Sequence, residues 1–125
     1  MTKSDWPAAE AALGRVIPEQ CRSSVTAAAG LEVSTPNAYA ALWPLSDVLR
    51  FNRDDAYGLA TAFPGLLLIG TAGGSELVAV DLNRSGEPVV ILNMISSSWD
   101  DVSDQGRPLD GWSEHLRAGG SVEFG

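Results

Sequence analysis

Cysteine and histidine are almost absent from this chain of 125 residues, which has one of each, Cys21 and His115. A single cysteine excludes an internal disulfide bond and fits a reducing compartment. A single histidine cannot build a histidine-rich metal site. Cys21 shares a helical stripe with Val25, so we interpret it as a small core residue rather than a nucleophile. We interpret His115 as a surface or half-buried residue near the end of a helix.

The motifs of the common enzyme classes are absent as well. The sequence has no GxSxG elbow, no P-loop, no HExxH and no paired CxxC. The run Ala72-Gly73-Gly74 joins two expected strands and opens no helix, so it is not a phosphate-binding fingerprint. The acidic clusters at Asp54 and Asp100 do not match the spacing of a calcium-binding loop. We therefore expect no catalytic residue, no cofactor and no metal site.

Long apolar runs and positive charge are also scarce. The longest apolar runs, such as Leu66 to Ile69, are far too short to span a bilayer, and the first residues have no run of signal-peptide length. We expect a soluble, cytoplasmic protein. Eight basic and 16 acidic residues give a net charge of −8, which repels nucleic acid and anionic membranes. The same charge attracts a basic partner and speeds its encounter.

The most regular stretch of the sequence runs from Gly65 to Met94. Glycines in its joints supply the positive φ of tight hairpins, so we predict a three-stranded antiparallel meander. Its strands, each bounded by Gly, Asn or Ser, are Leu66 to Thr71, Glu76 to Leu82 and Pro88 to Asn93. Tyr39 to Trp43 is expected to add a strand at one edge.

Four helices are predicted around this meander. They cover Pro7 to Leu13, Pro18 to Ala29, Asp47 to about Arg53 and Gly111 to about Arg117, with Asp5, Ser46 and Asp110 as N-caps of the first, third and fourth. Loops are expected at Leu31 to Ala38, Asn52 to Thr61 and Asp100 to Pro108, a loose end at Met1 to Ser4, and an edge strand or a loose tail at Ser121 to Gly125. The expected fold class is α+β. A single domain, 1–125, contains the meander 66–93 plus an edge strand, covered by N-terminal, middle and C-terminal helices.

The tryptophans have two interpretations. Trp6 and Trp112 lie on expected helices and are predicted to pack on the sheet. Trp43 and Trp99 flank loops, where an aromatic side chain serves either the core or an interface. The acidic runs also have two interpretations: they form either a solvated face or a surface for a basic partner.

The order of these segments resembles the SUKH superfamily, which includes a fungal cell-wall synthesis regulator and many bacterial toxin-immunity proteins. Two departures are Cys21, where an aromatic often follows the proline, and the acidic stretch Asp100 to Pro108. The resemblance covers about Asp5 to Leu116, within an expected domain core of about 5–117, and rests on short structural motifs. They are Ile17-Pro18-Glu19, Leu42-Trp43-Pro44-Leu45, Phe63 to Gly70, Gly73-Gly74-Ser75-Glu76, Val80-Asp81-Leu82, Gly86 to Val90, and Trp112 with Leu116.

The resemblance implies an α+β fold and a non-enzymatic role as an immunity protein that neutralises a cognate toxin, commonly a nuclease or deaminase. The net charge favours a basic toxin as the partner. We expect the contact surface on the sheet face or edge that the helices leave open, with the nearby loops. The candidate partner-binding residues are Trp43, Asp54, Asp55, Glu76, Asp81, Trp99, Asp100 and Asp101. The alternatives are a regulatory or scaffold domain with an endogenous partner and an enzyme that uses Asp or Glu pairs.

Overall fold

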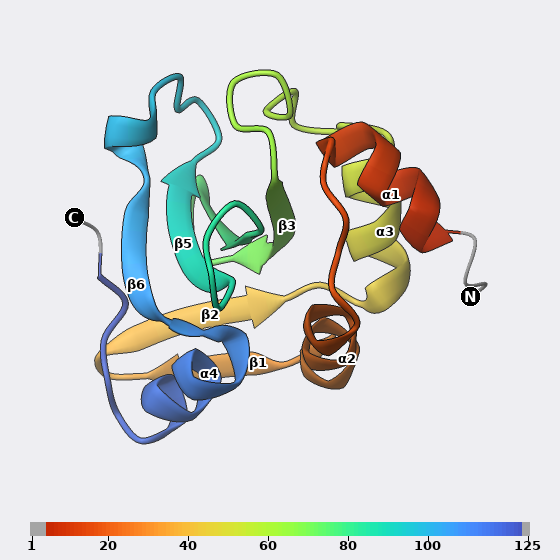
Figure 1. Cartoon of the computed structure of the whole chain (residues 1–125). Helices are drawn as coiled ribbons and strands as arrows, with labels where there is room; N and C mark the ends of the chain where they lie inside the picture. Colours follow the sequence, from red (N-terminus) through yellow and green to blue (C-terminus); the bar gives the residue numbers. More distant parts are fainter. Residues whose placement is uncertain (1–4, 124–125) are drawn as a thin grey trace.

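Six antiparallel strands and four α-helices make up the part of the chain that the structure, a computed structural model, describes: residues 5–123 (Figure 1). The strands form one curled sheet in the order in which they occur along the chain. The protein is therefore a small α+β domain, as the sequence predicts. The helices are α1 (Asp5–Leu13), α2 (Glu19–Ala28), α3 (Leu45–Arg53) and α4 (Leu109–Arg117). The strands are β1 (Glu32–Thr35), β2 (Ala38–Leu42), β3 (Leu66–Thr71), β4 (Glu76–Asp81), β5 (Pro88–Asn93) and β6 (Ser103–Pro108), and a short 3-10 helix, η1 (Trp99–Asp101), precedes β6.

The predicted meander is confirmed, because β3, β4 and β5 pair with one another in chain order. The predicted extent of the sheet is wrong at both ends. Leu31 to Ala38, expected to be irregular, contains β1, which forms a hairpin with β2 across a turn at Pro36 and Asn37. β2 is therefore an inner strand and not an edge strand. Asp100 to Pro108, expected to be a loop, contains part of η1 and all of β6, which pairs with β5.

The two missed strands share a physical reason. β1 buries only Val33, and β6 buries only Gln105, so neither shows the alternation of apolar residues that marks a half-buried strand. Each lies at an edge of the sheet, where backbone pairing to one neighbour holds the strand in place. The apolar side chains of that region come from the inner strands instead.

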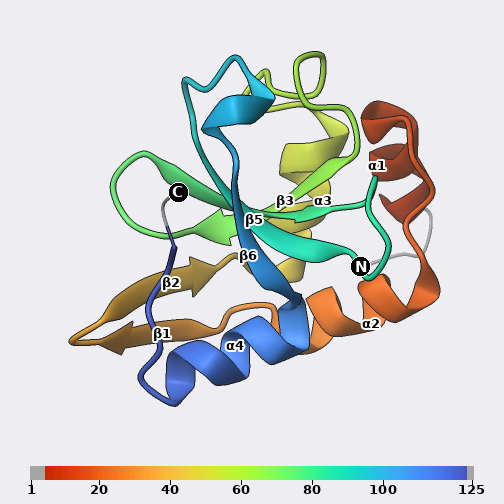
Figure 2. The same ribbon diagram turned by 60° about the vertical axis from the view of Figure 1, so that its left-hand side comes forward.

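All four helices contribute to one hydrophobic core against one face of the sheet. Figure 2 shows α2 and α4 along one side of the sheet, and α1 beside α3. The predicted apolar stripes are confirmed by burial. They comprise Trp6, Ala9 and Leu13 of α1, Cys21 and Val25 of α2, and Trp112 and Leu116 of α4, none of which is more than 8% exposed.

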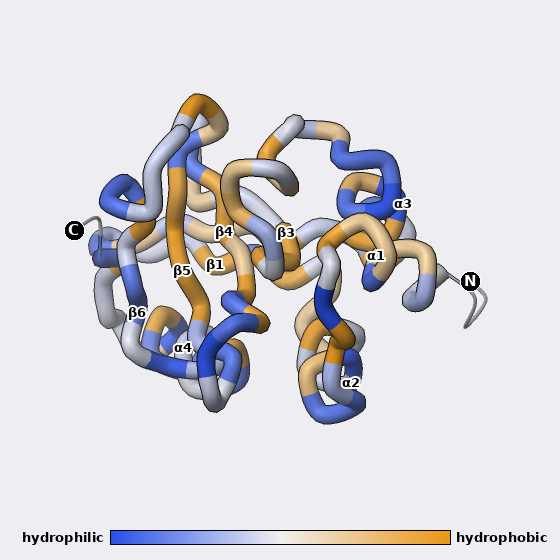
Figure 3. Tube along the Cα trace, turned by 45° about the horizontal axis from the view of Figure 1, so that its top comes forward, coloured by the Kyte–Doolittle hydropathy of each residue, from blue (hydrophilic) through white to orange (hydrophobic). Residues whose placement is uncertain are grey.

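A second core lies on the other face of the same strands. Leu59 and Phe63, from the α3–β3 connection (residues 54–65), pack against Leu66 and Leu68 of β3 and against apolar residues of β4 and β5. The inner strands are therefore buried on both faces, which is why their sequences are almost continuously apolar. Figure 3 shows this along β5, whose trace is coloured hydrophobic over most of its length.

The side chain of Asn52 joins α3 to the sheet and is only 3% exposed. β2 pairs with β3 at just two positions, and the chain that follows it turns away into α3. Leu68 of β3 therefore has no strand partner on that side. The Asn52 amide replaces one: its Oδ1 accepts from the Leu68 N–H at 2.9 Å, and its Nδ2 donates to the Leu68 C=O at 2.8 Å. The amide thus continues the ladder by one pair of hydrogen bonds.

A second buried amide, Gln105 of β6, holds the end of the chain. Its Nε2 donates to the backbone C=O of Glu123 at 2.6 Å, and its Oε1 accepts from the Glu123 N–H at 2.9 Å. The same Oε1 accepts from Nε1 of Trp112 at 3.2 Å. Val122 is buried beside this contact. The described part of the tail, 121–123, is therefore neither a strand nor loose, because a side chain fixes its backbone.

The N-caps predicted at Ser46 and Asp110 are wrong, because α3 and α4 each begin one residue before them, directly after a proline. Pro44 and Pro108 occupy the N-cap positions and form no side-chain cap. Proline suits the start of a helix because it has no N–H that would lack a partner there. Three predictions lie outside the described residues and side chains: the loose end at Met1 to Ser4, the N-cap at the Asp5 side chain, and the last two residues of the tail.

Candidate protein-binding surface

The β5–β6 connection (residues 94–102) carries most of the exposed large hydrophobic side chains of the described chain. Ile95 is 88% exposed, Trp99 43% and Met94 36%. Figure 3 shows the hydrophobic tip of this connection beyond the end of β5. Isolated exposed hydrophobic residues are ordinary, but three on one short segment form a patch of the kind that marks an interaction site.

Acidic side chains adjoin this patch. Glu76 of β4 and both Asp100 and Asp101 of η1 line one surface hollow of about 520 Å³ together with Ile95. Within the described chain these three carboxylates form no ion pair, and only Glu76 accepts a side-chain hydrogen bond, from Asn93 at 3.3 Å. The hollow is therefore negative and its charge is uncompensated, which favours a cationic partner.

Trp99 connects this surface to the second core. Its ring packs edge to face on Phe63, with centroids 5.2 Å apart and planes at 77°. The contact brings the β5–β6 connection against the α3–β3 connection, and the two lie side by side at the top of Figure 1. Trp99 packs on the core on one side and is exposed on the other, so its position agrees with both interpretations made from the sequence.

From the sequence we expect one face of the sheet to be open. In the structure that face is covered. Leu77, Ala79, Val90 and Leu92, which point to the face away from the helices, are each at most 1% exposed. Phe63 and Leu59 pack on that face from above, and Val102 adds to the cover. The candidate surface is therefore the outer side of the connections that cover the sheet.

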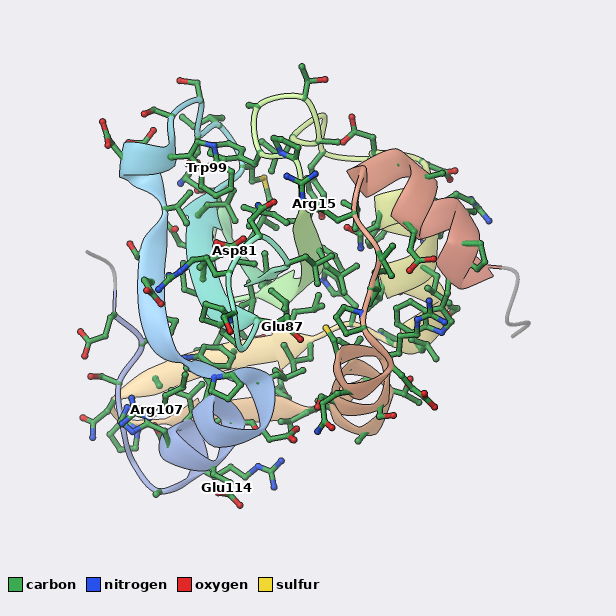
Figure 4. All side chains as sticks on the ribbon, in the orientation of Figure 1. Arg15, Asp81, Glu87, Trp99, Arg107 and Glu114 are labelled. Atoms are coloured by element: carbon green, nitrogen blue, oxygen red, sulfur yellow. The ribbon has the colours of Figure 1, made fainter. Side chains whose placement is uncertain are left out.

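Asp81, another predicted contact residue, lies outside the hollow of Glu76, Asp100 and Asp101, and its carboxylate makes its contacts within the fold. It is 4% exposed, and its Oδ1 accepts from the backbone N–H of Asn83 at 2.9 Å and from Asn83 Nδ2 at 3.0 Å. Asn83 in turn donates to the C=O of Pro64 and accepts from Arg15. Figure 4 shows Asp81 over the middle of the sheet, below Trp99. Its role is to hold the turn after β4 against the α3–β3 connection.

Three other sequence candidates form a second group around the end of α3. Trp43 is half-buried between Phe51, with centroids 4.8 Å apart, and Tyr57, with which it stacks at 5.9 Å. Asp54 pairs with Arg53 at 2.9 Å, and this hydrogen bond lowers the pKa of the Asp54 carboxyl. Asp55 accepts from the Ala60 N–H and shapes the loop. The contacts of Trp43 and Asp55 are thus within the fold, and they give this group less free surface than the β5–β6 connection.

Sequence reasoning missed two residues that define the surface, Met94 and Ile95. A signal was available in the local pattern, because Asn93 and Ser96 bracket them. These are residues that hydrogen-bond to nearby backbone and fix a turn. Apolar residues between two such turn formers are held away from the core.

The single cysteine and the single histidine lie on different helices, Cys21 on α2 and His115 on α4. The Cys21 thiol is 6% exposed, as expected for a core residue, and burial together with the nearby Glu87 carboxylate raises its pKa to about 12. His115 is half-buried in the last turn of α4, as expected. Residues 5–123 bring together no group of three or more His, Cys, Asp or Glu side chains that could hold a metal ion. No helix in this range has the length and apolar character needed to cross a membrane.

We expect the native protein to resist thiol labelling at about pH 8, because the reactive thiolate of Cys21 is suppressed and buried. The unfolded chain has an ordinary thiol pKa of 9.0, so it releases the proton at a lower pH than the folded chain does. Stability therefore falls as the pH rises from about 9 toward 12. Labelling with a disulfide reagent in buffer and in urea tests this, with Cys21→Ala as the blank. Native labelling as fast as that of the unfolded chain would contradict it.

Comparison with known proteins gives no match: no family model fits this chain, and no curated protein aligns with it.

Proposed function

We propose that this protein is a protein-binding module, and specifically an immunity protein that binds and neutralises a basic toxin of the nuclease or deaminase type. The observation that carries the proposal is the surface of the β5–β6 connection. There, exposed Ile95 and Trp99 adjoin the unpaired carboxylates of Asp100 and Asp101. An apolar centre with a charged rim is the usual anatomy of a protein interface.

The overall charge supports the choice of a basic partner. With a net charge of −8, the protein attracts a cationic surface over the range of the Debye length, about 8 Å at physiological salt. Such steering raises association rates by one or more orders of magnitude at low salt. An inhibitor that must capture a toxin quickly benefits from that rate. The resemblance to the SUKH superfamily supports the same class of function.

We expect the double variant Asp100→Lys, Asp101→Lys to associate about tenfold more slowly with the toxin at low salt and to show a flatter salt dependence. Stopped-flow binding to the purified product of the neighbouring gene, which the proposal takes as the toxin, measures both effects. The matched control is Glu19→Lys, Glu114→Lys, which changes the net charge equally at exposed sites. Figure 4 shows Glu114 at the opposite end of the molecule from Trp99. Equal slowing in both double variants would remove this surface from the proposal.

A rescue assay tests the function itself. Co-expression of the wild-type protein should restore growth to cells that produce the neighbouring toxin. If it rescues no adjacent toxin, the immunity role is wrong, and specific binding to a host protein would favour the regulatory or scaffold alternative.

A further inference from the structure

We propose that Ile95 is the apolar anchor of the interface and inserts into an apolar depression on a basic protein, whose Lys or Arg rim pairs with Glu76, Asp100 and Asp101. This inference rests on the proposed protein-binding function and names the chemistry that the partner surface presents.

Asn93 and Ser96 hold the turn that displays Ile95. The Asn93 Oδ1 accepts from the Ile95 N–H at 3.0 Å, and the Ser96 Oγ accepts from the Asn93 N–H at 3.0 Å. The Ser96 N–H donates back to the Asn93 C=O at 2.9 Å. Ser96 itself is 9% exposed, so the turn is fixed from beneath. Ile95 is 88% exposed because hydrogen bonds on both sides direct it outward.

The neighbouring β3–β4 turn braces this arrangement. The Met94 N–H donates to the C=O of Ser75 at 2.9 Å, and Asn93 Nδ2 donates to the Ser75 Oγ at 2.7 Å. The same Asn93 Nδ2 lies 3.3 Å from Glu76 Oε1, its cross-strand neighbour. The anchor and one of its acidic neighbours are thus set by one residue. A binding residue that is held in place before contact loses little conformational freedom on binding.

Charge complementarity indicates which kind of protein binds at Ile95 and the acidic hollow beside it. A second copy of this acidic chain would bring its own carboxylates to the same hollow, and like charges in close contact disfavour that pairing. A protein with an apolar depression and a basic rim satisfies both parts of the surface. Trp99, on the same connection, is 43% exposed and lines a separate hollow with Arg15, Pro64 and Asp81, so the anchor proposal rests on Ile95 and its acidic neighbours.

The first experiment needs no natural partner. An NMR titration with a short peptide of alternating lysine and leucine should shift the amide signals of Ile95, Asp100 and Asp101. Ile95→Ser should abolish these shifts, and Ile95→Leu should keep them. The matched control is Val16→Ser, since Val16 is a second highly exposed aliphatic residue, 76% exposed, on the α1–α2 connection and away from the acidic hollow. Shifts confined to the region of Val16, or no shifts at all, would overturn the proposal.

The second experiment uses the protein encoded beside this gene, which the proposed function takes as the toxin. Ile95→Ser should weaken its binding about 30-fold, the loss that corresponds to exposing one aliphatic side chain, while Val16→Ser should bind like the wild type. If the toxin binds wild type and Ile95→Ser equally, the anchor is wrong and the proposed function stands. A further outcome is that the toxin binds neither the wild type nor Ile95→Ser, while the peptide still shifts the Ile95 amide in the wild type alone. In that case Ile95 remains the anchor and the proposed immunity function is wrong.

Discussion

Asn52→Leu is expected to lower the free energy of unfolding by about 4 kcal/mol. Leucine has a similar size but no hydrogen-bonding group. The N–H and C=O of Leu68 would then be buried without partners, because β2 has already left the sheet at that point. Each buried backbone group without a partner costs about 1–3 kcal/mol.

Urea denaturation measures the loss, and hydrogen exchange locates it. The Leu68 amide should exchange slowly in the wild type and much faster in the variant, beyond the increase that global destabilisation explains. Asn37→Leu is the matched control, since Asn37 is exposed and its amide makes one hydrogen bond to a backbone C=O, that of Gly119. It should change stability by less than about 1 kcal/mol. Similar curves for the two variants would show that the Asn52 amide does not hold β3.

Gly70→Ala is expected to cost about 3 kcal/mol, although it adds a single methyl group. β2 crosses β3 so closely that a Cβ at Gly70 would lie 2.4 Å from the Ala41 C=O oxygen and 2.9 Å from the Leu42 Cα. Both are backbone atoms, so no side-chain rotation relieves the clash. Relief requires β2 to move away, which would break its two pairs with β3.

Gly111→Ala provides the control for this change. Gly111 lies in α4 without a positive φ, and an added Cβ would meet only Arg107 and Pro108 side-chain atoms at 3.9 and 4.0 Å. Alanine favours a helix over glycine by about 1 kcal/mol, so this variant should be as stable as the wild type or more stable. Thermal and urea unfolding of both variants settle the comparison. A Gly70→Ala protein that unfolds with the wild type would mean that the two strands are not in close contact.

The pattern of apolar residues in the sequence was enough to predict the strands and helix faces that form the hydrophobic core. β3, β4 and β5 are continuous runs such as Leu66 to Ile69, and the helical stripes of Trp6 and Trp112 have the expected spacing. β6 escaped prediction because its sequence, SDQGRP, carries no such pattern and depends on β5 for its pairing. The ladder completed by Asn52 escaped too, since its partner Leu68 lies far along the chain.

The candidate surface was predictable only in part, for the same reason. The sequence picked out Glu76, Asp100 and Trp99 by charge and residue type, and the structure brings the first two to one hollow beside the third. The sequence alone could not distinguish these residues from the buried Asp81, because burial of a carboxylate depends on a partner such as Asn83. It passed over Ile95, since an apolar residue in a loop gives no periodic signal.

The order of the strands has a consequence for how the chain assembles during synthesis. Each strand pairs with the strand made just before it, so every step of sheet formation joins strands that are consecutive along the chain, and the longest connection, from β2 to β3, contains α3. α2 is different, because it packs against α4, the last of the four described helices in chain order. The apolar stripe of Cys21 and Val25 therefore stays incompletely covered until α4 has been made. The docking of α4 is the step that completes the core.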